Sequence, residues 1–281
     1  MVRIITDTTA CIDLDYAKAH QISVIPQIIT FGDQSFYEGI ELDNSAFMKR
    51  LRNSSSLPKT AAPPPELFTL EFERLVPSGE PILCIHPSCE VSGTVRSATI
   101  AAQDFPSADI RIIDSRLVAA PLLAMVKMAV SWAEAGNDID SIETRIRSMI
   151  PRGRIYFLVD TLDYLAKGGR IGGASALLGN ILQVKPILTV KEGKVEPFEK
   201  LRTHSRAIAR LIEITKDQFS RNGDGHLYVM HADAKSEADK LANYLSGYFE
   251  LTDIPIIDLP PAIVVHGGPG ILALSFFVNE G

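Results

Sequence analysis

The sequence predicts an α/β protein of two domains, a mainly parallel, layered N-terminal α/β domain and an α+β C-terminal domain. Its 281 residues are enough for one large or two ordinary domains, each with its own core. In the first half, four apolar strand-like runs are each followed by a polar loop and a helical pattern, which is typical of a parallel sheet. In the second half, a hairpin signal and mixed strands and helices break this alternation. The run Pro151-Arg152-Gly153 separates the two patterns, so we expect domains at residues 1–152 and 153–281.

The strand-like runs of the first half are short and rich in Ile, Leu and Val. They occupy residues 2–7, 22–29, 81–86 and 110–113. The helical patterns between and after them include a long apolar one that ends at Glu134. The others occupy residues 42–52, 96–105 and 141–149. The most apolar segment, residues 117–133, contains Pro121, Lys127 and Ser131 and is short for a membrane span, so a buried core helix fits it better.

Polar residues follow these strands, at the edge of the predicted sheet where ligands bind in open α/β folds. Asp7-Thr8-Thr9 follows the first strand, and Ser92-Gly93-Thr94 lies in the loop after the third. An ordinary helix cap is one interpretation of both motifs. For Asp7-Thr8-Thr9 the alternative is a ligand position at the strand end. For Ser92-Gly93-Thr94 it is an anion cradle, because free backbone amides at a helix start and neighbouring hydroxyls attract negative charge.

Residues 53–65, NSSSLPKTAAPPP, are rich in serine and proline. The three consecutive prolines forbid a helix and favour a stiff, extended segment. Thr60 is therefore expected on a rigid loop. The segment is either a linker or the rim of a pocket.

Residues 154–188 carry the most distinctive pattern of the chain. Residues 155–159 are a bulky apolar run typical of a buried strand, and Asp160-Thr161 can cap a short helix over residues 162–165. Gly168-Gly169 then favour the positive φ that ends a helix. The stretch is completed by a second short helix and a strand, over residues 174–182 and 184–190.

Arg170 lies between two pairs of glycines, so we expect it on a glycine-rich loop. One interpretation is a tight helix connection with a solvated arginine. The other is an anion site, since a guanidinium offers a planar fork of donors and glycines expose backbone amides beside it. The run GGRIGG does not fit the dinucleotide fingerprint G-x-G-x-x-G, and no G-K-[ST] of a P-loop follows it.

The remaining elements of the second half follow from the same periodicities. We expect a hairpin over residues 187–190 and 194–198, helices over 205–222 and 235–247, and strands over 226–231, 254–259 and 271–278. His266 is the most informative histidine, because it lies between a predicted buried strand and the loop Gly267-Gly268-Pro269-Gly270, which is richer in glycine than packing requires. His231, also at a strand end, shows that such a position occurs without function.

The composition excludes several classes of protein. A net charge of −6 argues against a protein built to grip nucleic-acid phosphates. The three cysteines, Cys11, Cys84 and Cys89, form no C-x-x-C pair, so neither a disulfide framework nor a structural metal site is indicated. The cysteine pattern and an N-terminus without a signal peptide predict a cytoplasmic protein that needs no cofactor, no metal and no stable membrane insertion.

Two functional hypotheses use these polar groups. The order Ser92, Asp114, His266 is that of an α/β-hydrolase triad, but the nucleophile elbow requires glycines where this chain has Glu90 and Thr94. The other hypothesis is binding, in which hydroxyls, an imidazole and backbone amides hold a carboxylate without reacting with it.

Several motifs, in order, resemble those of the DegV family, which includes the fatty-acid-binding subunits of bacterial fatty acid kinase. The matching motifs span nearly the whole chain. They are Asp7-Thr8-Thr9, Lys59-Thr60, Ser92-Gly93-Thr94, Val159-Asp160-Thr161-Leu162 through Lys167-Gly168-Gly169-Arg170-Ile171-Gly172, Lys185-Pro186-Ile187, Leu201-Arg202-Thr203 and His266-Gly267-Gly268-Pro269-Gly270.

The resemblance implies a non-enzymatic protein of phospholipid metabolism that buries a long-chain fatty acid, such as palmitate, stearate or oleate, between its domains. It implies carboxylate contacts from Thr60, Ser92 and His266. It places near the head group Gly93, Thr94, Arg170, Gly267 and Gly268. Arg170 and Arg202 would help to dock a separate ATP-dependent fatty acid kinase, which would convert the bound acid to an acyl phosphate. The absence of a nucleotide fingerprint agrees with this division of labour.

The chain departs from the family pattern in two places. Ala61 and Ala62 stand where the family has a serine and a glutamine, so a hydroxyl and an amide are missing beside the head group. Residues 117–121, LVAAP, replace the small residues and glycines usual after Asp114-Ser115-Arg116. These differences bear on chain-length preference and on kinase partnership, and they leave the carboxylate-binding residues intact.

Overall fold

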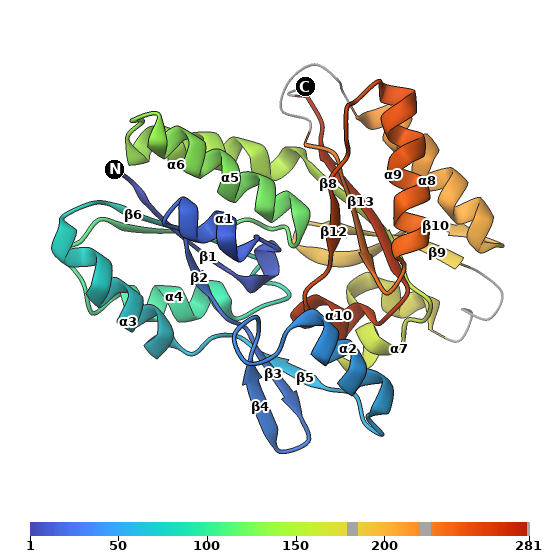
Figure 1. Ribbon diagram of the computed structural model, residues 1–281, viewed down its shortest axis with the longest axis horizontal. Helices are drawn as coiled ribbons and strands as arrows, with labels where there is room; N and C mark the ends of the chain where they lie inside the picture. Colours follow the sequence, from blue (N-terminus) through green and yellow to red (C-terminus); the bar gives the residue numbers. More distant parts are fainter. Residues whose placement is uncertain (179–184, 220–225, 280–281) are drawn as a thin grey trace. The chain divides into compact units, whose positions relative to one another are not determined.

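The computed structural model describes residues 1–178, 185–219 and 226–279. The chain divides into two compact units, each with its own sheet and helices (Figure 1). Unit 1 comprises Met1–Pro151 with Pro260–Ala262, and unit 2 comprises Arg152–Leu259 with Ile263–Gly281. The predicted α/β class is confirmed.

Unit 1 is built around a parallel sheet of four strands in the order β2-β1-β6-β7. The strands are β1 (Arg3–Asp7), β2 (Ser23–Ile25), β6 (Ile82–His86) and β7 (Ile110–Asp114). The helices of this unit are α1 (Leu14–Ala19), α2 (Asn44–Asn53), α3 (Pro65–Leu75), α4 (Thr94–Ala102), α5 (Ala120–Glu134) and α6 (Ile139–Met149), with the short 3-10 helices η1 (Thr8–Ala10), η2 (Val76–Ser78) and η3 (Ile150–Arg152). Three of the four predicted strand–loop–helix units, those that begin with β1, β6 and β7, are present as predicted.

Three helices of unit 1 begin where the sequence provides a capping carboxylate. Asp13, Asp43 and Asp138 each accept a hydrogen bond from the backbone N–H three residues further on, at 2.7–2.8 Å, and so start α1, α2 and α6. Helices α3 and α4 pack on one face of the sheet, and α5 and α6 lie on the other (Figure 1). The first interface buries Phe68 and Phe72 completely.

A second sheet of unit 1 corrects the strand predicted over residues 22–29. Pro26 separates β2 from β3 (Ile28–Phe31), because proline has no N–H for a ladder and ends the parallel pairing at Ile25. Strand β3 pairs instead with β4 (Gln34–Tyr37) and β5 (Lys59–Ala61), both antiparallel.

Thr60 lies on β5 and not on the loop that the prolines predicted. It pairs with Ile29 of β3, so its backbone is held by a ladder. The extended conformation that the prolines favour is the one that a strand needs, so the segment is stiff as predicted, but strand pairing holds it.

Unit 2 contains a mixed sheet of six strands in the order β10-β9-β8-β13-β11-β12. The strands are β8 (Gly153–Leu158), β9 (Lys185–Lys191), β10 (Lys194–Leu201), β11 (Tyr228–Ala232), β12 (Ile256–Asp258) and β13 (Ile271–Phe277). The pairing is antiparallel except between β11 and β12, and β9 and β10 form the predicted hairpin. The helices are α7 (Asp163–Lys167), α8 (His204–Gln218), α9 (Lys235–Phe249) and α10 (Pro261–Gly267, which starts in the segment grouped with unit 1), with the 3-10 helix η4 (Gly172–Leu177).

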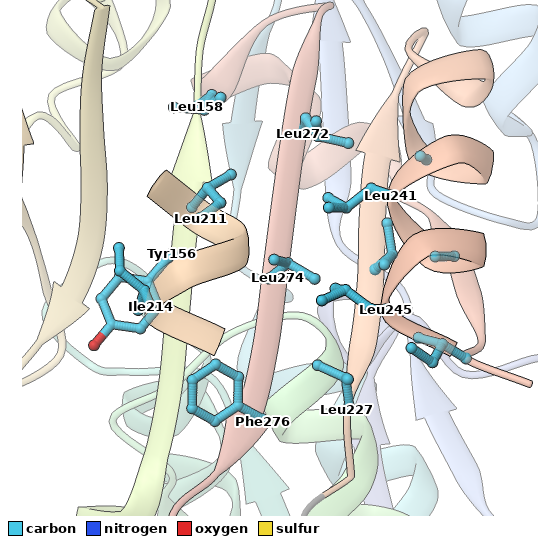
Figure 2. Packing of buried hydrophobic residues seen from close by; sticks show 14 of the residues in the cluster. Tyr156, Leu158, Leu211, Ile214, Leu227, Leu241, Leu245, Leu272, Leu274 and Phe276 are labelled. Carbon is cyan, nitrogen blue, oxygen red and sulfur yellow. The ribbon is translucent and has the colours of Figure 1, made fainter. Parts of the chain in front are cut away.

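The core of unit 2 lies between α8 and α9 and one face of this sheet (Figure 2). Leu272, Leu274 and Phe276 alternate along β13 toward the two helices, where Leu211 and Leu241 meet them. This is the period of two expected of a strand with a buried face.

His266 corrects a second prediction, because it lies in the last turn of α10 and not at the end of a strand. The β-branched run Ile263-Val264-Val265 favours a strand by its intrinsic propensity. Its low helix propensity costs only about 0.5 kcal/mol per residue, which burial of Val264 and Val265 exceeds. Pro261 occupies the first helical position, where its missing N–H is tolerated.

The predicted helix over residues 174–182 is the 3-10 helix η4 as far as it is described. Residues 179–182 and 220–222 of two predicted helices, and Val184, lie outside the described residues. In the part of the chain that the structure describes, no helix is both long and apolar enough to cross a bilayer.

Candidate functional site

The carboxyl ends of the unit 1 strands carry a polar cluster. Asp7 ends β1 and His86 ends the neighbouring β6, and His86 Nδ1 lies 2.8 Å from Asp7 Oδ2. Both side chains are completely buried. Because a carboxylate only accepts hydrogen bonds, His86 Nδ1 carries the proton of this bond. The sequence marked this sheet edge as a ligand position, but it did not single out His86.

Ser92 lies in the loop between β6, which ends at His86, and α4. Its Oγ is 2.8 Å from Thr94 Oγ1, and the backbone N–H of Thr94 is 3.4 Å from Ser92 Oγ. The N-cap residue of α4 is Gly93, which has no side chain to cap the helix. Neither Ser92 nor Thr94 is therefore an ordinary N-cap, and the ordinary-cap interpretation of this motif is wrong.

Gly93 brings the Ser92 loop against the segment that carries Thr60. A Cβ at position 93 would lie 3.3 Å from the Cβ of Ala62, which is tighter than ordinary packing. Ala62 is two residues after Thr60, so the two candidate hydroxyl segments of unit 1 adjoin each other. Side chains at positions 60 and 62 point to the same side of an extended chain.

Glu38 and Gln27 are two buried residues of unit 1 that sequence reasoning missed. Glu38 accepts hydrogen bonds from Thr8 Oγ1 and from the backbone N–H of Ala262, the latter at 2.6 Å. Burial raises the pKa of Glu38 to about 7. No motif marked either residue, because their roles depend on partners far away in the sequence.

His266 is the centre of the candidate site in unit 2, where two glycine-rich segments interlock. A Cβ at position 168 would overlap with His266 Nδ1, so only glycine permits this contact with the imidazole. Gly268, at φ +80°, lies against the ring of Tyr164, and Gly270, at φ +84°, lies against the carboxylate of Asp160. The backbone of Gly168 thus lies close against the imidazole, and the loop after His266 packs on Tyr164 and Asp160.

Arg170 lies on the glycine-rich loop as predicted, and its Nη1 donates to the carbonyl of Gly168 at 2.7 Å. Burial, with the Arg170 charge as a second cause, lowers the pKa of His266 to about 4. At neutral pH the imidazole is therefore uncharged, and it has one N–H to donate and one nitrogen to accept.

The second pair of glycines packs η4 onto the hairpin. Cβ atoms at positions 172 and 173 would overlap with the backbone carbonyl of Val195 and the carboxylate of Glu196. The glycines of this run therefore serve close packing inside unit 2. Arg202, the other predicted docking residue, is exposed just beyond the end of β10.

Ser92 and Asp114, the two residues of the alternative hydrolase triad that lie in unit 1, form hydrogen bonds with other groups. Asp114 Oδ1 accepts from the backbone N–H groups of Cys89, at 3.3 Å, and Arg116, at 2.9 Å. The hydroxyl partner of Ser92 is Thr94. Neither arrangement resembles a nucleophile with an adjacent base. Within the described residues, no group of three or more His, Cys, Asp or Glu side chains is arranged to hold a metal ion.

The predicted site residues thus fall into two groups. Unit 1 carries Thr60, Ser92, Gly93 and Thr94, and unit 2 carries Arg170, Arg202, His266, Gly267 and Gly268.

Comparison with known proteins gives consistent matches over nearly the whole chain. A family model described as "Uncharacterised protein, DegV family" matches residues 1–279. A DegV domain-containing protein of Streptomyces coelicolor is 36% identical over 275 residues, which is 97% of each chain. One from Clostridium acetobutylicum is 33% identical and covers 99% of this chain and 98% of its own.

Solved structures agree with this assignment. DegV of Bacillus subtilis, described as a fatty acid binding protein, is 30% identical with a TM-score of 0.91 over 99% of both chains. A fatty-acid-binding DegV family protein of Streptococcus agalactiae is 28% identical with a TM-score of 0.91, over 100% of this chain and 99% of that chain. The motifs, the fold and these matches together show that the chain belongs to the DegV family.

Proposed function

We propose that this protein binds one long-chain fatty acid, such as palmitate, stearate or oleate, and holds it without reacting with it. The observation that carries the proposal is the uncharged His266 beside Arg170, fixed by Gly168 in a glycine-rich segment. A neutral imidazole donates one N–H to a carboxylate, and the nearby guanidinium favours the negative charge. Relatives of known structure that bind fatty acids support this choice of ligand.

The carboxylate is proposed to accept hydrogen bonds from Thr60, Ser92 and His266, with the acyl chain buried between the two domains. Gly93, Thr94, Arg170, Gly267 and Gly268 would surround the head group. Paired donors are needed because a carboxylate that leaves water without hydrogen bonds incurs a large free-energy penalty.

The acyl chain is proposed to lie on the face of the unit 2 sheet opposite to α8 and α9. That face carries Phe157, Ala273 and Phe277, which alternate with the core residues of β8 and β13. Burying about a dozen methylenes at ~0.8 kcal/mol each contributes roughly 10 kcal/mol before the entropic cost of binding. The tail then supplies most of the affinity and the head group sets the orientation.

We further propose that the bound acid is presented to a separate ATP-dependent fatty acid kinase, which forms the acyl phosphate and feeds phospholipid metabolism. Arg170 and Arg202 would contact that partner. The protein itself would be a cytoplasmic binding subunit that needs no cofactor or metal, and it would hydrolyse no ester.

The test measures palmitate affinity by calorimetry in Ser92→Ala and His266→Ala. Each variant is expected to lose about tenfold in affinity, the effect of one hydrogen bond to a charged group, with an unchanged melting temperature. Ser97→Ala on α4 and His231→Ala on β11 are the matched controls and should bind as the wild type does.

Arg202→Glu should keep the affinity and lose acyl-phosphate formation by the kinase. Unchanged affinity in both Ser92→Ala and His266→Ala would contradict the proposed cradle, and p-nitrophenyl ester turnover that disappears in Ser92→Ala would favour the hydrolase.

A further inference from the structure

Gln27, which lies between β2 and β3, is held by hydrogen bonds at every polar group of its backbone and at its side-chain amide nitrogen. Its backbone N–H donates to Thr8 Oγ1 at 3.1 Å, and its carbonyl accepts from the N–H of Glu38 at 2.9 Å. Its Nε2 donates to Asp7 Oδ1 at 3.0 Å and to Thr94 Oγ1 at 2.9 Å. The residue is 3% exposed, so bulk solvent has little access to these bonds. Both hydrogens of the amide nitrogen are therefore committed.

Asp7 fixes the direction of the first of these bonds. Its Oδ1 also accepts from the backbone N–H of Thr9, at 3.0 Å, and from Thr9 Oγ1, at 2.6 Å, while Oδ2 faces His86 Nδ1. A carboxylate oxygen can only accept, so the amide of Gln27 must turn its NH₂ group toward Asp7. The second hydrogen of the same NH₂ group then points at Thr94.

Thr94 passes this direction on to Ser92. Thr94 Oγ1 accepts from Gln27 with one of its two lone pairs, and its one hydrogen can be donated to Ser92 Oγ, 2.8 Å away, in a pair whose distance allows either hydroxyl to be the donor. Ser92 Oγ then accepts from Thr94, and its hydrogen is directed away from the cluster. The carboxylate of Asp7 thus fixes the Gln27 amide, and a Thr94 hydroxyl that donates to Ser92 continues the same direction.

We propose that Asp7, Gln27 and Thr94 form a directional hydrogen-bond relay that presents Ser92 as a donor, with Gln27 as its positioning residue. The inference rests on the proposed binding of a carboxylate at Ser92. It specifies the ligand head group as a hydrogen-bond acceptor carrying negative charge, since a donated hydrogen bond is roughly twice as strong to an ionised acceptor as to a neutral one. The relay therefore gives Ser92 a preference for a negatively charged acceptor over a neutral one.

The test compares two ligands with the same tail, palmitate and hexadecanol, in Thr94→Val and Thr94→Ser. Thr94→Val removes the hydroxyl at nearly constant volume, and Thr94→Ser keeps it. We expect Thr94→Val to lose about tenfold in palmitate affinity and less than about threefold in hexadecanol affinity, because only the charged acceptor depends on the donor. Thr94→Ser should restore the preference for the acid. A purely structural role for Thr94 would weaken both ligands equally.

Gln27→Met is a second variant, in case Thr94→Val fails to fold. It removes the hydrogen bonds that the Gln27 amide donates to Asp7 and Thr94. It should reduce the ratio of acid to alcohol affinity in the same direction, with a melting temperature high enough for binding to be measured. Equal losses for acid and alcohol, an unchanged ratio, or no rescue by Thr94→Ser would overturn the relay while leaving fatty-acid binding intact. Failure of the wild type to bind palmitate at all would overturn the proposed function and the relay with it.

Discussion

His266 illustrates how single residues in this protein are set by their neighbours. Burial and the charge of Arg170 lower its pKa to about 4, while the ordinary histidine value is 6.5. The imidazole is thus neutral throughout the physiological range, and it can hold a carboxylate without a net ion pair. The contact that fixes its position comes from the backbone of Gly168.

The first prediction at this scale concerns that contact. Gly168 has φ −78°, a conformation that any residue adopts, so Gly168→Ala adds a methyl group without backbone strain. The new Cβ would overlap with His266 Nδ1 and would lie 3.0 Å from the carbonyl of Tyr164. We expect palmitate affinity to fall at least about tenfold, as it does when a charged hydrogen bond is lost.

Gly247→Ala is the matched control for this variant. Gly247 lies in α9 with nothing within 4 Å of a Cβ, so alanine there should preserve binding and stabilise the helix by up to about 1 kcal/mol. Wild-type affinity in Gly168→Ala would show that His266 does not need its present position. Calorimetry and thermal melting measure both effects.

From the sequence alone, only residues that stand in a recognisable motif could be predicted as site residues. Ser92, Arg170 and His266 stand in recognisable runs, and the loop position of Arg170 follows from its glycines. Gln27, His86 and Glu38 stand in no motif, and their importance arises from partners 11 to 224 residues away. The pairing of Asp7 with His86 is fixed only when β1 and β6 become neighbours.

At the level of elements, the sequence pattern located most strands and helices but misassigned those whose type depends on packing. Periodicity correctly predicted the β9–β10 hairpin and the parallel strands β1, β6 and β7 of unit 1. It failed at residues 22–29, where Pro26 divides one apolar run between two sheets, and at α10, where buried β-branched residues form a helix. In both cases tertiary contacts outweigh local propensity.

The second prediction concerns Glu38, which joins the end of β4 to η1 and to the first turn of α10. Its pKa is about 7 in the folded protein against an ordinary value of 4.5, because burial disfavours the charged form. An acid whose folded pKa is raised loses stabilising free energy as pH rises between these two values. The wild type should therefore become less stable, relative to Glu38→Gln, by roughly 3 kcal/mol between pH 4.5 and pH 8.

Urea unfolding of both proteins at pH 4.5 and pH 8 measures this difference. Glu38→Gln removes the titrating group and keeps a side chain of the same size. Parallel pH profiles for the two proteins would mean that Glu38 titrates normally, which would contradict its burial. The opposite slope, with the wild type gaining stability as pH rises, would contradict the sign of the shift.

For the whole molecule, the order of the motifs was more informative than any single motif. One run such as GGRIGG fits several kinds of loop, whereas seven motifs in the same order identify a family. The family match over residues 1–279 and the similarity to DegV of Bacillus subtilis confirm that assignment and the α/β fold. The proposed acyl-chain length and the proposed kinase partner depend on surfaces that the motifs do not encode.

The most direct test of the proposed function is mass spectrometry of lipid extracted from the protein after native purification and denaturation. A buried tail of about a dozen methylenes contributes roughly 10 kcal/mol, so the ligand should survive purification. We predict one long-chain fatty acid per protein chain, with less in Ser92→Ala and His266→Ala. A wild-type protein that carries no fatty acid and takes up none when incubated with palmitate would contradict the proposal.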